Sequence, residues 1–144
     1  MEIIDSFSEE FEFLSNFFPS KITDTSGNTY PTVEYYFQAM KTFDPEKRKL
    51  IAAAPTPGQA KRLGRMVELR EDWEDVKNDV MRLALWQKFS KPDLRKMLLD
   101  TGDAELIEGN WWHDTYWGVC NGEGENHLGK LLMEIRKDIK ELNI

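Results

Sequence analysis

Three residues of the sequence have side chains and a spacing that suit acid–base chemistry. Glu34, Gln38 and Lys41 lie at positions i, i+4 and i+7 of a segment with helical periodicity, and this spacing places them on one face of a helix. A carboxylate held two turns from an amine can transfer protons, and an amine with a lowered pKa can act as a nucleophile. The ordinary explanation is a solvated helix face opposite the apolar residues Val33 and Phe37. From the residues alone, the solvated face is the favoured interpretation.

A second candidate is an aromatic segment, residues 109–118, which begins and ends with glycine and contains Trp112, Asp114 and Trp117. Such aromatic side chains usually pack in a core. In an irregular segment they can also stack on a flat heterocycle, with the Asp114 carboxylate near a sugar. Because loops carry function more often than regular elements do, this segment predicts part of a binding site.

A third candidate is basic. Arg62 and Arg65 are three residues apart, with Lys61 beside them, and the forked guanidinium groups suit a phosphate. The ordinary alternative, which we favour from the residues alone, is a solvated helix face with ion pairs to Glu68 or Glu71.

The composition narrows the chemistry. The net charge is −7, from 19 basic and 26 acidic residues, which argues against a surface devoted to duplex nucleic acid. Two histidines and one cysteine argue against a zinc site, so we expect no metal and no cofactor. No apolar run approaches the roughly 20 residues that span a bilayer. The N-terminal residues do not resemble a signal peptide, and Cys120 cannot form an internal disulfide, so we expect a cytoplasmic protein.

The elements that must position these side chains are mainly helical. The 144 residues predict one domain of the α+β class with a small N-terminal β-hairpin over residues 21–30, whose turn contains Gly27. Thr32, Thr56 and Asn126 are candidate N-caps, and residues 101–125 read as irregular. Helices are expected at residues 33–43, 45–53, 57–65, 73–89, 92–99 and 127–142.

Eight segments, in order and at ordinary spacings, together resemble the NADAR family, the group that includes the YbiA swarming-motility-associated proteins. The resemblance covers nearly the whole chain and is far more specific than a single motif. The segments are residues 13–17 (FLSNF), 30–41 (YPTVEYYFQAMK), 55–65 (PTPGQAKRLGR), 69–73 (LREDW), 101–103 (TGD), 108–110 (EGN), 114–118 (DTYWG) and 126–133 (NHLGKLLM).

The resemblance implies an N-glycosidase linked to the metabolism of NAD and ADP-ribose. Members are associated with cleavage of ribosylamino-pyrimidine phosphates, early intermediates of riboflavin synthesis, and others remove ADP-ribose from guanine bases. By motif match, the family's functional residues fall on Glu34, Lys41, Trp73 and Asp114. The chain departs from many relatives at Tyr35, where they carry histidine, and this difference bears on substrate specificity.

In the mechanism that we hypothesise for such an enzyme, Lys41 attacks C1 of the sugar to form a Schiff base, Glu34 transfers protons, and Asp114 orients the sugar or stabilises positive charge. A two-carboxylate hydrolysis by Glu34 and Asp114 is the alternative mechanism. Further substrate contacts are expected from Asn16, Gln38, Arg62, Arg65, Trp73, Trp112, Trp117 and Asn126.

The expected partner is a small nucleotide-like substrate, which includes a modified base in single-stranded nucleic acid. We expect no membrane partner and no obligate protein partner. A non-catalytic module that binds ADP-ribose or an NAD-like ligand is the alternative function.

Overall fold

The computed structural model describes residues 2–142, and Met1 and residues 143–144 lie outside the described range. The chain forms two compact units. One is Asn16–Lys88, and the other combines the described residues before Asn16 with those from Phe89 onward. The elements are mainly helical with three two-stranded sheets, which confirms the expected α+β class. The treatment of the whole chain as one domain stays a prediction.

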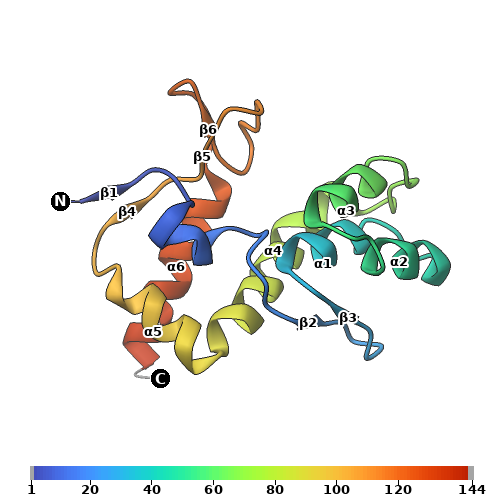
Figure 1. Ribbon diagram of the computed structural model, residues 1–144, viewed down its shortest axis with the longest axis horizontal. Coiled ribbons are helices and arrows are strands. Elements are labelled where there is room, and N and C mark those ends of the chain that lie inside the picture. The colour runs from blue at the N-terminus through green and yellow to red at the C-terminus, as the bar shows by residue number, and fades with distance from the viewer. Residues whose placement is uncertain (1, 143–144) are drawn as a thin grey trace. The chain divides into compact units, whose positions relative to one another are not determined.

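The unit Asn16–Lys88 contains a hairpin and four helices (Figure 1). Strands β2 (Ile22–Thr23) and β3 (Thr29–Tyr30) pair antiparallel, as the turn residues predicted. Asp24 fixes the turn, because its carboxylate accepts hydrogen bonds from the backbone N–H groups of Ser26 and Asn28 and from the Tyr30 hydroxyl. The helices are α1 (Val33–Ala39), α2 (Pro45–Ala52), α3 (Pro57–Gly64) and α4 (Trp73–Ser90), the last belonging to this unit up to Lys88.

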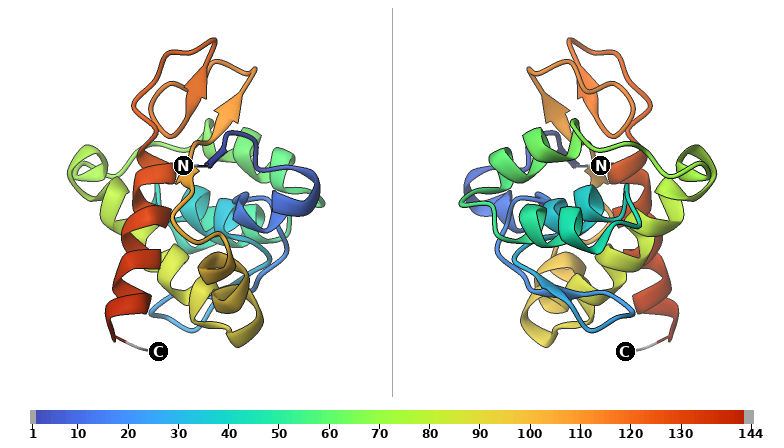
Figure 2. Two further views of the ribbon diagram at one scale, coloured as in Figure 1. Left: turned by 90° about the vertical axis from the view of Figure 1, so that its left-hand side faces the viewer. Right: turned by 90° about the vertical axis from the view of Figure 1, so that its right-hand side faces the viewer.

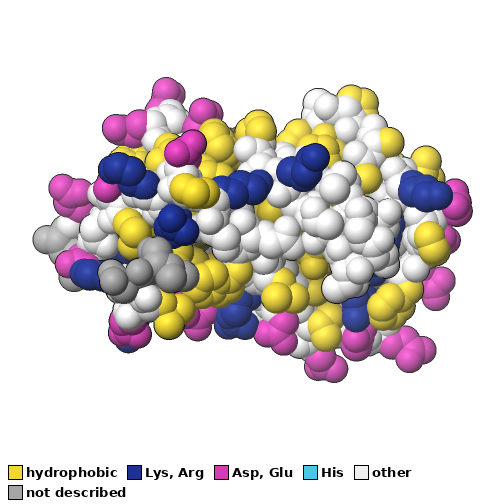
Figure 3. All heavy atoms as spheres, turned by 90° about the horizontal axis from the view of Figure 1, so that it is seen from below, with side chains coloured by type: hydrophobic (Ala, Val, Ile, Leu, Met, Phe, Trp, Pro, Cys, Tyr) yellow, Lys and Arg dark blue, Asp and Glu magenta, His cyan; other side chains and the backbone are white. Residues whose placement is uncertain are grey.

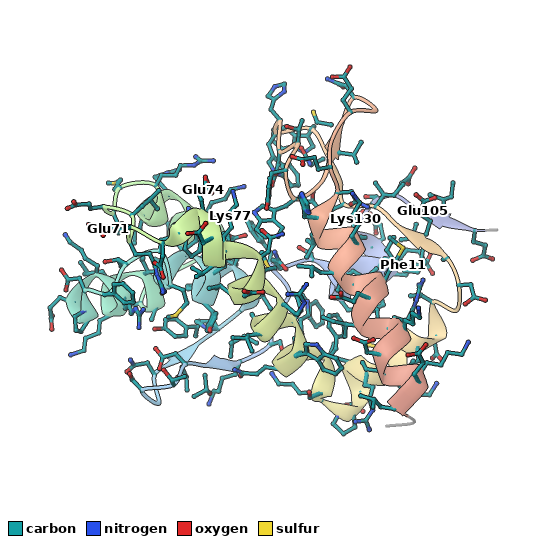
Figure 4. The ribbon with its side chains drawn as sticks, turned by 180° about the vertical axis from the view of Figure 1, so that it is seen from behind. Phe11, Glu71, Glu74, Lys77, Glu105 and Lys130 are labelled. Atoms are coloured by element: carbon teal, nitrogen blue, oxygen red, sulfur yellow. The ribbon has the colours of Figure 1, made fainter. Side chains whose placement is uncertain are left out.

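Local capping chemistry starts these helices where the sequence predicts. The hydroxyl of Thr32 accepts from the N–H of Tyr35 at the start of α1, and Thr56 caps α3 in the same way. Each such cap stabilises a helix by about 1 kcal/mol. On α4, Glu74 and Lys77 form an ion pair of 2.6 Å (Figure 4). Helix α1 packs against both α2 and α3.

The second unit holds the N-terminal segment and the C-terminal helices. It contains β1 (Ile3–Ile4), a 3₁₀ helix (Glu9–Leu14), α5 (Pro92–Asp100), β4 (Glu105–Leu106), β5 (Gly109–Asn110), β6 (Val119–Cys120) and α6 (His127–Leu142). Strand β1 pairs with β4, and β5 pairs with β6, both in parallel. The loop that carries β5 and β6 projects beyond the N-terminal end of α6 (Figure 2).

Two expectations about secondary structure are wrong, and two elements were missed. The first helix ends at Ala39 rather than at residue 43. Residues 101–125 are not wholly irregular, since they hold three short strands. The 3₁₀ helix and β1 were not expected at all. In the described part of the chain, no helix combines the length and apolar character that crossing a membrane requires.

Candidate functional site

Helix α1 carries two of the three expected catalytic-face residues, and the third lies just beyond it. Met40 is the C-cap residue of α1, so Lys41 belongs to the following turn. The helix cannot continue far, because Asp44 precedes Pro45 and must be extended to cap α2. Arg70 occupies the carbonyl groups that a longer helix would use, since its guanidinium donates to Met40 O and its backbone N–H to Lys41 O.

Glu34 and Gln38 are buried rather than solvated. Their exposed fractions are 8% and 4%, and Gln38 Nε2 donates a hydrogen bond of 2.6 Å to Glu34 Oε2. The preference for a solvated face is therefore wrong for these two residues. A buried carboxylate held by a charge-assisted hydrogen bond is typical of a functional group whose orientation is fixed.

A glycine on α3 makes room for the Gln38 side chain. A Cβ atom added at Gly64 would lie 2.7 Å from Cδ of Gln38 and 2.9 Å from its Cβ, closer than real contacts allow. With Nε2 held by Glu34, Oε1 of Gln38 is buried and forms no hydrogen bond among the described residues. The absence of a side chain at position 64 therefore leaves the space in which the amide lies.

Lys41 is half-buried in a mixed electrostatic environment. Burial lowers the pKa of its amine below the ordinary value of 10.5, and the nearby cations of Arg65 and Lys61 lower this pKa further, while Glu34 acts in the opposite direction. The Nζ atom lies 5.9 Å from the centre of the Phe37 ring. An amine in such surroundings is neutral more often than an exposed lysine, which is the condition for nucleophilic attack.

Trp73 packs against Phe37, the aromatic residue next to Lys41. It is 5% exposed, and its ring packs on Phe37 with 5.1 Å between the ring centres and 58° between the planes. The structure therefore gives Trp73 a packing role against the residue that faces Lys41. A direct contact between Trp73 and substrate stays a prediction.

Asn16 lies beside Glu34, because its carbonyl oxygen accepts from the Glu34 N–H at 3.0 Å. Its side chain is 9% exposed. Nδ2 contacts Sδ of Met81 at 3.6 Å, and Oδ1 has no hydrogen-bond partner among the described residues. A buried acceptor without a partner costs about 1–3 kcal/mol, and the expected contact of Asn16 with substrate stays a prediction.

Arg62 and Arg65, at the C-terminal end of α3, differ in their effect on Lys41. Arg65 lies close enough to Lys41 to lower its pKa, whereas Arg62 has no such effect. Both side chains are exposed, and neither forms an ion pair within the described residues. The expected ion pairs to Glu68 or Glu71 are therefore not formed, which leaves both guanidinium groups available to an anion.

In the second unit, Asp114 organises its own loop. Its Oδ1 accepts from the backbone N–H groups of Tyr116 and Trp117, at 3.2 and 2.9 Å. Asn110 closes the same loop from the other side, since it accepts from the Asp114 N–H and donates to the Asp114 carbonyl. Asp114 thus has a structural role that an asparagine could share, and its catalytic role stays a prediction.

The tryptophans of this loop differ in exposure. Trp112 is 43% exposed and Trp111 is 82% exposed, and their rings meet edge to face with centres 5.5 Å apart. Trp117 instead packs edge-on against Tyr116, with ring centres 4.9 Å apart. Trp112 is therefore the more exposed of the two predicted stacking residues, whereas Trp117 packs against its neighbour Tyr116.

Asn126 does not cap α6 through its side chain. Its φ angle of 55° is in the left-handed region, Oδ1 accepts from the N–H of Glu108, and Nδ2 donates to the carbonyl of Leu106. The side chain joins the start of α6 to the segment around β4, so the expected N-cap is wrong. Its expected contact with substrate stays a prediction, and the structure gives it a bracing role.

Two residues that position the α1 side chains were not expected from the sequence. Gly64 was read only as part of a helix, although glycine within a helix costs about 1 kcal/mol relative to alanine and so calls for a packing reason. Phe37 was assigned to the apolar face and was not linked to Lys41. In the described part of the chain, no group of three or more His, Cys, Asp and Glu side chains is arranged to hold a metal ion.

Comparisons with known proteins identify the relatives of this chain. The sequence profile described as the NADAR domain matches residues 5–140. The N-glycosidase YbiA of Shigella flexneri serotype 5b is 44% identical over 138 residues, which cover 93% of this chain and 85% of that protein. The NMR structure of the Escherichia coli protein YbiA superposes with a TM-score of 0.86 at 41% identity and covers 99% of this chain and 87% of that one.

A longer relative contains a similar region. The riboflavin biosynthesis protein VVA0006 of Vibrio vulnificus is 39% identical over 137 residues, which cover 92% of this chain and 37% of that protein. The profile match and the 44% identity each extend over nearly the whole sequence. The chain therefore belongs to the NADAR family, and it shares the N-glycosidase activity of the YbiA proteins.

Proposed function

We propose that this N-glycosidase hydrolyses the bond between C1 of a ribosyl group and the amine nitrogen of a ribosylamino-pyrimidine phosphate, with Lys41 as the nucleophile. The observation that carries the proposal is the environment of Lys41. Its amine is half-buried, close to Glu34 and to two cations that favour its neutral form. The name of the Vibrio vulnificus relative supports a substrate from riboflavin synthesis.

The reaction has two stages. The ribosylamine opens to an imine at C1, and the neutral amine of Lys41 adds to that carbon. The bond from C1 to the pyrimidine amine then breaks, the amine leaves with a proton, and a Schiff base joins C1 to Nζ. Water adds to this carbon, and collapse of the adduct releases the sugar aldehyde and restores Lys41. No oxidant or reductant is needed at either stage.

Glu34 moves the protons. It takes the proton that Lys41 loses on attack and delivers it to the leaving nitrogen, and it later activates the water. The hydrogen bond from Gln38 holds one carboxylate oxygen in place, which limits the orientations that the carboxylate can take. In this proposal Asn16 Oδ1 accepts from a hydroxyl or N–H group of the substrate, which removes the cost of leaving that atom unpaired.

Arg65 is the proposed phosphate contact, because it lies near Lys41 and its fork suits a phosphate monoester. A small anion fits the charge of the protein better than a nucleic-acid duplex. On the face shown in Figure 3, lysine and arginine side chains are interspersed with acidic and apolar ones and do not form a continuous basic surface.

ADP-ribosylated guanine is the second candidate substrate. The exposed rings of Trp111 and Trp112 favour it, since they offer a stacking surface to a purine. The net charge of −7 restricts this activity to a nucleotide presented singly or in a single strand.

A side-by-side assay tests these proposals. The protein is incubated with a ribosylamino-pyrimidine phosphate and, separately, with single-stranded DNA that carries ADP-ribosylated guanine, and the release of base is followed by chromatography. We expect the pyrimidine substrate to be turned over faster. Preferred turnover of the modified DNA would replace the first substrate with the second. Saturable binding of both without turnover would identify a binding module and overturn the proposal.

A further inference from the structure

The contact between α1 and α3 is built on small residues of α3. Ala60 is fully buried, and Gly64 is buried one turn further along the same helix. Glycine within a helix costs about 1 kcal/mol relative to alanine, so its presence needs a packing reason. The reason is on the facing helix, where the Gln38 side chain lies in the space that a Cβ atom at position 64 would fill.

The Gln38 amide is held at one end only. Nε2 donates to Glu34 at 2.6 Å, while Oε1 is the atom that faces Gly64 and has no hydrogen-bond partner among the described residues. Rotating the amide by half a turn would bring Oε1 against the carboxylate. That contact is unfavourable, because both oxygen atoms are hydrogen-bond acceptors and repel each other. The amide therefore has one productive orientation, and the space above Gly64 is what permits it.

We propose that Gly64 is a positioning residue for the N-glycosidase reaction, which acts by leaving the space in which the Gln38 amide meets the Glu34 carboxylate. This inference rests on the proposed role of Glu34 in proton transfer. Gly64 has no side chain to offer a substrate, so its effect on the reaction passes through Gln38.

A methyl group at position 64 would collide with the Gln38 side chain. An added Cβ would lie 2.7 Å from Cδ of Gln38, and a change of rotamer could relieve that contact. It would also lie 2.9 Å from Cβ of Gln38, which is fixed to the α1 backbone. Relief therefore requires both a new rotamer of Gln38 and a small separation of α1 from α3. The new rotamer is the change that removes the hydrogen bond to Glu34, because both partners of that bond lie on α1.

A double-mutant cycle tests the inference. We expect Gly64→Ala to lower kcat by about tenfold, with KM little changed, because it removes an orienting contact rather than a binding contact. Gln38→Ala removes the same hydrogen bond together with the amide atoms that the new methyl group would meet, while residue 38 keeps its Cβ. No hydrogen bond to Glu34 is then left to lose. In the Gln38→Ala background, Gly64→Ala should therefore have no further effect on kcat.

Gly58→Ala is the matched control. It makes the same change in the same helix, where the nearest atom to an added Cβ is Thr56 Oγ1 at an ordinary 3.9 Å, and we expect wild-type kcat. Multiplicative losses for Gly64→Ala and Gln38→Ala would overturn the inference, as would wild-type kcat in Gly64→Ala.

Folding is checked by circular dichroism. If Gly64→Ala does not fold, Gln38→Met decides, because it keeps the length of the side chain and removes the amide. A lowered kcat at unchanged KM then supports the inference, and wild-type kcat contradicts it. Failure of the proposed function gives a different result, since Glu34→Gln would then retain turnover whatever the cycle shows.

Discussion

Gln38 donates a 2.6 Å hydrogen bond to Glu34 from one helical turn away, and both side chains are more than nine-tenths buried. The pair is costly to bury, because a carboxylate loses its hydration and the Gln38 Oε1 atom is left without a partner. In an enzyme, such a cost is often offset by function, since a fixed carboxylate is what proton transfer at a sugar carbon requires.

Replacement of Glu34 by glutamine should abolish proton transfer while the volume of the side chain is preserved. We expect kcat to fall by about 10²- to 10⁴-fold, the usual contribution of a general acid–base group. Glu46→Gln on α2 is the control, because Glu46 is exposed and forms a surface ion pair with Lys49 at 3.6 Å. Wild-type turnover by Glu34→Gln would remove the carboxylate from the mechanism.

The amine of Lys41 should react at a lower pH than an ordinary lysine, because burial and the cations of Arg65 and Lys61 lower its pKa below 10.5. The measurement is the pH dependence of labelling by trace acetic anhydride, read residue by residue by mass spectrometry without substrate. Arg65→Gln removes one lowering influence, so the labelling curve of Lys41 should move to higher pH. Arg62→Gln should leave it in place, and equal shifts in the two variants would contradict the assignment.

Asp114 can be tested for its two roles separately. Asparagine keeps an oxygen for the N–H groups of Tyr116 and Trp117 but removes the charge. We expect Asp114→Asn to match the wild type in thermal unfolding and Asp114→Ala to lose about 1 kcal/mol of stability. If the charge also supports the reaction, Asp114→Asn should lose about tenfold or more in kcat. Unchanged kcat would restrict Asp114 to the loop.

The hairpin turn should make stability depend on pH through Asp24. Burial raises the pKa of this carboxyl, but hydrogen bonds from Tyr30, Asn28 and Ser26 together outweigh burial and hold the pKa below 3.8. Because the folded-state pKa is depressed, the stabilisation is present above about pH 4 and is lost as the pH falls through the folded-state value.

The measurement is urea unfolding at pH 7 and at acid pH. Asp24→Ala should lose about 1–3 kcal/mol at pH 7 and show a weaker acid dependence than the wild type. Asp79→Ala is the control, because the Asp79 side chain is 71% exposed and pairs with Arg82 on the surface. It should change stability by about 0.5 kcal/mol or less. If Asp24→Ala loses as much stability between pH 7 and acid pH as the wild type does, other carboxyl groups cause the acid dependence.

The sequence predicts most of the helices, because residues at or next to each helix start mark where it begins. Thr32 and Thr56 cap helices, and Pro45, Pro57 and Pro92 stand at first helical positions. The strand pairs β1–β4 and β5–β6 could not be predicted in this way. Each strand is two residues long, and each partner lies outside the reach of a local pattern.

In the candidate site, too, some features follow from the local sequence and others depend on contacts between distant residues. The spacing of Glu34 and Gln38 on one helix face is readable from the sequence, whereas their burial depends on what packs against α1. The end of α1 before Lys41 follows from the cap that Asp44 provides for α2 and from the contacts of Arg70 with Met40 and Lys41. The contacts of Arg70 join residues about 30 positions apart, so they cannot be predicted from the sequence of the helix itself.

Borohydride trapping tests the central claim, the Schiff base on Lys41. The protein is mixed with a ribosylamino-pyrimidine phosphate, sodium borohydride is added during turnover, and the adduct is located by peptide mass spectrometry. We predict a reduced sugar phosphate on Lys41 in the wild type and in the Lys61→Arg control, and none in Lys41→Ala, which should also be inactive. No adduct on Lys41, together with substantial activity of Lys41→Ala, would contradict the mechanism.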